Sequence, residues 1–121
     1  MTGKSGRFSK SKGSRFERDL AKELRFYGYD ARRTAQYCGK TGDAADLIGL
    51  PKIHIEAKHQ ERMRLYDWYE QSVRDTGDSG DIPVVMHKAN CRPILVSLSL
   101  EDFMTIYREW EAGLDTAGKS S

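Results

Sequence analysis

The chain has 121 residues, of which 38% are hydrophobic, and this content is enough for one compact domain with one modest core. Its formal net charge is only +2, from 20 Lys and Arg against 18 Asp and Glu, so net charge alone does not indicate a nucleic-acid partner. Two isolated cysteines, and no apolar run near the roughly 20 residues that a membrane span needs, predict a cytoplasmic protein without a membrane partner.

The first segment of the chain is basic and rich in Gly and Ser. Up to Arg18 it carries six Lys and Arg and one acid, Glu17. Such a composition buries little apolar surface, so residues 1–13 are predicted to form a flexible basic arm suited to a phosphate backbone. A merely solubilising terminus is the alternative.

The next elements are a helix and a hairpin. Apolar residues at helical spacing predict a helix that begins after an N-cap at Ser14 and ends at Gly28. "YDARRTA" (29–35) is a predicted strand, and the following segment, "QYCGKTGDAA" (36–45), is a predicted Gly-bearing loop. "DLIGL" (46–50) and "KIHIEAK" (52–58) predict a hairpin whose second strand alternates apolar and polar residues.

The second half repeats the alternation of helix and strands. A helix is predicted from Gln60 to Thr76, with its aromatic residues in the core or at an interface between subunits. "IPVVMHK" (82–88) and "RPILVSL" (92–98) predict two strands, and Ser99 caps a last helix. The order αβββαββα predicts an α/β fold with helices covering a mixed sheet, in one domain of residues 14–112, followed by a disordered tail of 113–121.

Glu56 and Lys58 leave the same face of the predicted second hairpin strand, about 6.5–7 Å apart. A hard cation such as Mg²⁺ needs more than one carboxylate, and Asp46 is the candidate for a second. A three-residue loop at residues 50–52 brings Asp46 opposite Glu56, whereas a two-residue loop brings Leu47 there. A surface ion pair between Glu56 and Lys58 is the alternative reading.

Glu17 is a third carboxylate of interest, at the margin of the first helix's apolar stripe. It leans toward the predicted sheet. Ser14 and Glu17 also fit a capping box, in which Glu17 only bonds the cap's backbone. The sequence leaves both roles open.

Together these segments resemble the PD-(D/E)XK nuclease superfamily, whose fold is the restriction-endonuclease-like αβββαβ core. The resemblance covers roughly residues 13–107 and is nearest to small Holliday-junction resolvases of archaeal and phage type, through "GSRFERDLAKELRFYGY", "GDAADLIGL" and "IHIEAKHQERMRLYDWYEQ". Ala45 stands where the family usually has proline, and Asp43 is a rival to Asp46. Thr34 or Thr41 stands for the Ser or Thr that the family often has nearby.

The resemblance implies a set of roles for these residues. Asp46, Glu56 and the Ala57 carbonyl would bind Mg²⁺, or alternatively Mn²⁺, with Glu17 contributing directly or through water, and Lys58 would orient or activate the attacking water. Branched DNA would be the substrate, and a homodimer would make two symmetric cuts. The predicted DNA contacts are Lys10, Lys12, Arg15, Arg32, Arg33, Lys40, Gln60, Arg62 and Arg64.

The sequence thus predicts a Mg²⁺-dependent endodeoxyribonuclease, a Holliday junction resolvase that works in the host cytoplasm if a phage encodes it. A nicking, restriction-like or repair nuclease of the same superfamily is the first alternative. A non-catalytic DNA-binding module is the second. The three histidines are interpreted as scattered surface or phosphate-contacting groups, and His54, which shares the face of Glu56, is the candidate exception.

Overall fold

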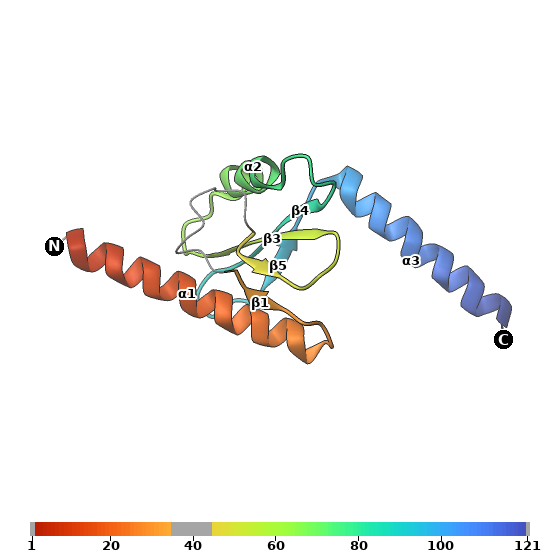
Figure 1. Cartoon of the computed structure of the whole chain (residues 1–121), viewed down its shortest axis with the longest axis horizontal. Helices are drawn as coiled ribbons and strands as arrows, with labels where there is room; N and C mark the ends of the chain where they lie inside the picture. Colours follow the sequence, from red (N-terminus) through yellow and green to blue (C-terminus); the bar gives the residue numbers. More distant parts are fainter. Residues whose placement is uncertain (1, 35–44, 121) are drawn as a thin grey trace.

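The computed structural model describes residues 2–34 and 45–120, with side chains described for 13–34 and 45–115. Its elements follow the predicted order (Figure 1). They are α1 (Thr2–Phe26), β1 (Arg32–Arg33), β2 (Leu47–Ile48), β3 (Ile53–His59), α2 (Leu65–Thr76), β4 (Ile82–Lys88), β5 (Leu95–Ser97) and α3 (Leu100–Ser120). The predicted hairpin, strand pair and order of elements are confirmed. None of the described helices is both long enough and apolar enough to cross a membrane.

The strands form one mixed sheet in the order β1-β2-β3-β4-β5. β3 and β4 are parallel, and the other neighbours are antiparallel. The parallel pair is the centre of the sheet, where β3 and β4 are most deeply buried. Because strands buried on both faces have no solvent-exposed side, polar residues on β3 lie beneath a helix.

Two helices enclose the sheet, with α1 on one face and α2 on the other (Figure 1). Phe16, Leu20 and Ala21 of α1 pack with Leu47 of β2 and Ile55 of β3 in one buried cluster. Beneath α2, the buried residues are Trp68, Ser72 and Thr76, which recur every four positions. The odd-numbered positions of β3 therefore face α1, and the even-numbered positions, including Glu56, face α2.

α2 begins later than predicted, at Leu65 instead of Gln60. The Gln60 N–H donates to the Lys88 carbonyl at 3.1 Å, and a Glu61 carboxylate oxygen accepts from the Asn90 N–H. These bonds hold the segment against the β4–β5 turn, which prevents a helical conformation. The helix also buries fewer aromatic residues than a core role predicts: Trp68 is buried, but Tyr66 is 82% exposed.

Both terminal helices are longer than the sequence predicted. α1 begins at Thr2, so Ser14 lies inside a helix and is not an N-cap, and α3 continues through residue 120 instead of ending in a disordered tail. No proline occurs in either segment to stop a helix. Ser99 does cap α3, since its hydroxyl accepts from the Asp102 N–H at 3.0 Å. The predicted boundaries of the nuclease domain, residues 14–112, stay a prediction.

α3 does not cover the sheet as predicted but extends away from it (Figure 1). Its apolar stripe is exposed, including Leu100, Phe103 and Trp110. Phe103, Tyr107 and Trp110 contact one another along the helix, with ring centroids 6.1 and 5.6 Å apart. Apart from its first turn, which borders β5 and α2, the described part of α3 presents an apolar surface that residues 13–34 and 45–99 do not cover.

Candidate active site

Asp46 and Glu56 lie opposite each other across the β2–β3 pair. Leu47 pairs with Ile55, so the next positions in this antiparallel register are Asp46 and Glu56. The Asp46 N–H donates to the Ile55 carbonyl at 2.9 Å, and the Ala57 N–H donates to Asp46 Oδ2 at 2.8 Å. The predicted register is confirmed, and the alternative that pairs Leu47 with Glu56 is excluded.

The hairpin turn sets this register. The Ile53 N–H donates to the Leu50 carbonyl at 3.1 Å, which closes the turn around Pro51 and Lys52. Gly49, at the end of β2, has a φ of 123° that favours glycine. Because loop length and turn type fix hairpin register, these residues determine which side chains meet at Glu56.

Glu56 is buried among other ionisable groups. Only 2% of the residue is exposed, and burial raises its pKa to about 7. Its contact with His54 lowers the pKa, whereas the neighbouring carboxylates of Asp46 and Asp75 raise it. The distance from His54 Nε2 to Glu56 Oε1 is 3.5 Å. The carboxyl group is thus poised to give up its proton when a cation arrives nearby.

Glu17 approaches the site from α1. It accepts a hydrogen bond from Arg33 Nε at 2.9 Å, and burial, followed by the charge of Asp46, raises its pKa. Arg33 and Lys58 lower that pKa through their positive charges. The capping-box reading is wrong, because Ser14 lies within α1. Glu17 is instead part of a charged group that joins α1 to the ends of β1 and β3.

Lys58 completes the arrangement. It follows Glu56 by two positions on β3, so the two side chains share a face, and it is half-buried. It lies close enough to Glu17 to lower that residue's pKa. Asp46 thus pairs with Glu56, and the charges of Asp46 and Lys58 both act on Glu17, so the four side chains predicted to be catalytic interact electrostatically. The alternative of a plain surface ion pair is wrong for Glu56, which is not on the surface.

Oxygen donors around a buried carboxyl group are a fitting environment for a hard divalent cation. Asp46, Glu56 and Asp75 supply carboxylates, and a cation among them relieves the repulsion that otherwise favours a proton on Glu56. The donor set fits the predicted metal. Ala57, the predicted backbone ligand, already ties Asp46 to β3 through its N–H.

A family model described as "Phage putative PDDEXK endonuclease" matches residues 8–116. The chain belongs to this family. Its fold is also similar to that of Archaeoglobus fulgidus Hjc, a Holliday junction resolvase from an archaeal hyperthermophile, with a TM-score of 0.56, 28% identity and 72% of each chain covered. None of the curated proteins matches the sequence.

As a PD-(D/E)XK endonuclease, the chain is a nuclease of a superfamily that generally uses divalent metals. Its mixed five-stranded sheet with flanking helices is the restriction-endonuclease-like fold predicted from the sequence. Ala45 at the position of the usual proline leaves the Asp46 geometry intact, because the Asp46 N–H and carboxylate both bond to β3.

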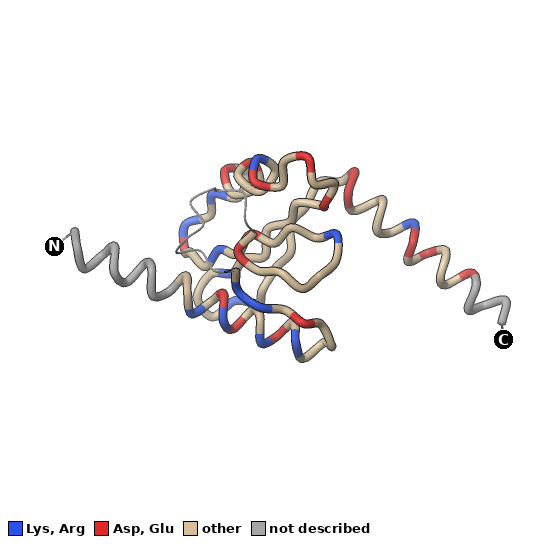
Figure 2. The backbone as a smooth tube through the Cα atoms, viewed as in Figure 1, with Lys and Arg blue, Asp and Glu red and all other residues tan. Residues whose placement is uncertain are grey.

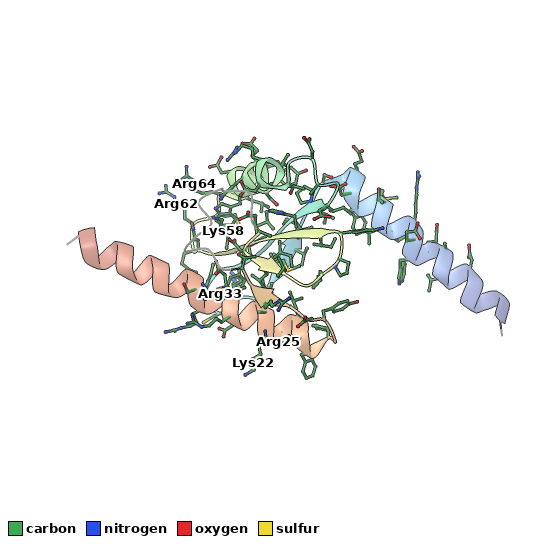
Figure 3. All side chains as sticks on the ribbon, in the orientation of Figure 1. Lys22, Arg25, Arg33, Lys58, Arg62 and Arg64 are labelled. Atoms are coloured by element: carbon green, nitrogen blue, oxygen red, sulfur yellow. The ribbon has the colours of Figure 1, made fainter. Side chains whose placement is uncertain are left out.

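The basic residues of the nuclease gather on α1, β1 and the loop before α2, whereas α3 is mostly acidic (Figure 2). Arg15, Arg32 and Arg62 are exposed, and Arg64 forms an exposed ion pair with Asp67 at 3.3 Å. Figure 3 shows Lys58, Arg62 and Arg64 on one side of the body. Of the remaining predicted DNA contacts, Gln60 is exposed, the side chains of Lys10 and Lys12 are not described, and Lys40 lies outside the described residues.

The sequence did not predict two residues that lie beside the candidate active-site carboxylates. Asp75 lies beside Glu56, and Arg33, predicted only as a DNA contact, is the partner of Glu17. Asp75 was detectable in principle, because it lies three positions after Ser72 in the stripe that faces the sheet. Arg33 gave no signal, since its contact with Glu17 joins residues 16 positions apart.

Proposed function

We propose that this endonuclease is a Mg²⁺-dependent enzyme that hydrolyses phosphodiester bonds in branched DNA, with the four-way junction as its substrate. The observation that carries the proposal is the pairing of Asp46 with Glu56 across the hairpin, with Lys58 next on the same face. Similarity to a Holliday junction resolvase supports the choice of substrate.

Asp46, Glu56 and the Ala57 carbonyl would hold the ion, and Glu17 would contribute directly or through water. A bound divalent ion supplies an activated water and neutralises charge that develops on the phosphate. Lys58 places an ammonium group beside the same acids, where it orients the water and offsets negative charge. Arg33 holds Glu17 in position through the bond at 2.9 Å.

The DNA would lie against the basic side of the molecule. Arg15, Arg32, Arg62 and Arg64 are exposed, and they would contact phosphates without reading bases. A phosphate surface of this kind detects the shape of branched DNA. The acidic α3 would lie outside that surface.

Symmetric cleavage of a junction needs two active sites, and a second copy of the chain would supply the other. A groove of about 660 Å³ runs between α2 and β5, lined by Tyr66, Tyr69, Val96, Leu98 and Phe103 among others. It continues into the exposed apolar stripe of α3. A partner that offers both an apolar helix and an apolar groove is this chain itself, so we place α3 of each copy in the groove of the other.

The decisive experiment compares cleavage of a synthetic four-way junction and a linear duplex of the same sequence, with Mg²⁺ and with EDTA. We expect paired, symmetric cuts in the junction only, and only with the metal. Glu56→Gln and Asp46→Asn should abolish cutting while keeping junction affinity, because neither residue lies on the basic surface. Equal rates on both substrates would assign the enzyme to a nicking or repair role instead.

A further inference from the structure

A second group of possible metal ligands lies beneath α2, next to the proposed catalytic centre. His54, Glu56 and Asp75 each have a ligand atom within 4.8 Å of the others. His54 and Glu56 are on the face of β3 that α2 covers, and Asp75 is near the end of α2. Asp75 adds a carboxylate beside Glu56 but is not among the ligands proposed for the catalytic ion, and His54 has no role in the mechanism proposed above.

The imidazole of His54 has a nitrogen that lacks a hydrogen bond. His54 is 6% exposed, and its Nε2 has no hydrogen-bond partner among the described residues. On the neighbouring strand, Pro83 and Val85 lie beside His54 and Glu56 and offer no side-chain hydrogen bond. The nearest acceptor is Glu56 Oε1 at 3.5 Å, the outer limit for a hydrogen bond. A buried nitrogen with so weak a contact costs up to about 1–3 kcal/mol, and this favours a bound ligand.

The spacing of His54 and Glu56 suits a metal ion, and the ligand atom of Asp75 lies within 4.8 Å of both. Two ligands bound to one ion at about 2.1 Å stand about 3.0–3.5 Å apart, and the distance from His54 Nε2 to Glu56 Oε1 is 3.5 Å. That distance is too long for a strong charge-assisted hydrogen bond. The polar groups of α2 nearby are already used, because Thr76 Oγ1 donates to the Ser72 carbonyl at 2.6 Å and Ser72 Oγ to the Val84 carbonyl at 3.4 Å.

An entry path also exists. His54 and Asp75 both line a cleft of about 580 Å³ beside the hairpin turn. Two acids, Asp30 and Asp81, and two basic residues, Arg32 and Lys52, also line it. An ion therefore reaches His54 without passing through the site at Asp46 and Lys58. Entry path, ligand identity and ligand spacing are the criteria by which a metal site is judged.

We propose that His54, Glu56 and Asp75 form a second cation site, selective for a first-row transition ion such as Mn²⁺ or Zn²⁺ over Mg²⁺. The imidazole donor gives this selectivity, because Mg²⁺ prefers oxygen ligands and imidazole suits transition metals. Glu56 belongs to both sites, so its carboxylate bridges two ions. The proposal of this second cation site does not depend on DNA being the substrate of the enzyme.

Mn²⁺ titrated into metal-free, DNA-free protein tests the site, with bound ions counted by electron paramagnetic resonance and imidazole ligation detected from its ¹⁴N coupling. We expect two ions per wild-type chain, one of them coupled to nitrogen. His54→Gln should remove the coupling and weaken the second ion more than about tenfold, since even residues that only orient a ligand contribute 10–100-fold. His59→Gln, on the same strand but the opposite face, is the matched control.

Two further variants keep the outcomes distinct. Asp75→Asn, a near-isosteric change at a half-buried position, should also weaken the nitrogen-coupled ion more than about tenfold, while Asp46→Asn should remove only the uncoupled one. Either of two results would overturn the second site and leave the proposed function standing. One is ¹⁴N coupling that persists in His54→Gln. The other is a wild-type chain that binds a single ion, without ¹⁴N coupling, and loses that ion in Asp46→Asn. Binding of no ion at all would overturn both.

Discussion

Glu56 has both acidic neighbours and a histidine neighbour, and together they influence how readily its carboxyl group ionises. Its buried carboxyl group faces the acids Asp46 and Asp75, which disfavour ionisation, and His54, which favours it. Without a metal, a proton is the simplest way to reduce the repulsion. The same carboxyl group should therefore respond to both pH and divalent ions.

The metal-free protein should lose stability as pH rises. Glu56 ionises at about 4.5 when unfolded but at about 7 when folded, so its contribution is complete below pH 4.5 and lost as pH rises to about 7. A shift of this size corresponds to roughly 3 kcal/mol. Urea unfolding in EDTA at pH 5 and pH 8 measures the loss, and Glu56→Gln should abolish most of it. An unchanged slope in that variant would contradict the predicted origin.

Arg33 should control the pH dependence of cleavage through Glu17. Burial and Asp46 raise the pKa of Glu17, and Arg33 lowers it. Arg33→Met should thus raise this pKa further and move the acidic limb of the single-turnover rate profile to higher pH. Arg32→Met, at the adjacent exposed position, is the control and should weaken DNA binding without moving the limb. Identical profiles in both variants would mean that Arg33 only contacts phosphate.

At the scale of elements, the hairpin of β2 and β3 positions the site. Its short turn fixes the register, and β1 packs against the end of β2 where Gly49 lies. A Cβ at Gly49 would clash with the Asp30 carbonyl oxygen and come within 2.6 Å of the Ala31 Cα. Glycine is therefore needed here both for its φ and for the space.

Gly49→Ala should destabilise the protein by more than about 2 kcal/mol, since it combines backbone strain with a steric clash. Gly28→Ala is the matched control, because Gly28 also has a positive φ, of 100°, but nothing lies within 4 Å of a Cβ there. We expect this control to cost only about 1 kcal/mol. Thermal melts compare the two, and equal losses would show that the close approach of β1 does not matter.

Local patterns predicted the elements better than they predicted how the elements meet. Alternation in "KIHIEAK" and the turn at Pro51 predicted the Asp46–Glu56 pairing, because hairpin register depends on neighbouring residues. Asp75 and Arg33 were missed, since they reach the site through packing between distant elements. The start of α1 was also missed, because Ser14 resembles a cap wherever the helix begins.

At the scale of the whole molecule, α3 is the feature least explained by the single chain. It extends from the body with Leu100 76%, Phe103 47% and Trp110 58% exposed. Exposed apolar surface of this extent usually marks an interaction site. The acidic residues of α3 argue against DNA as its partner.

Trp110→Glu should convert the proposed dimer to a monomer, because it places a charge on the apolar stripe that the groove of the other copy would cover. Sedimentation velocity measures the change. Phe26→Glu, an equally severe change at a residue that is 86% exposed at the end of α1, should leave the dimer intact. A monomeric wild-type protein would rule out the exchange of α3, without bearing on the chemistry at Glu56.

The bond from the Ala57 N–H to the Asp46 carboxylate has one more consequence. It ties an acid on one strand to the backbone that carries Glu56 and Lys58, so this bond must break before β2 can slide along β3 and separate these groups. A change in a distant loop therefore leaves the relative placement of these groups unchanged as long as the bond is kept. The hairpin thus carries three of the proposed catalytic groups within one short stretch of the chain.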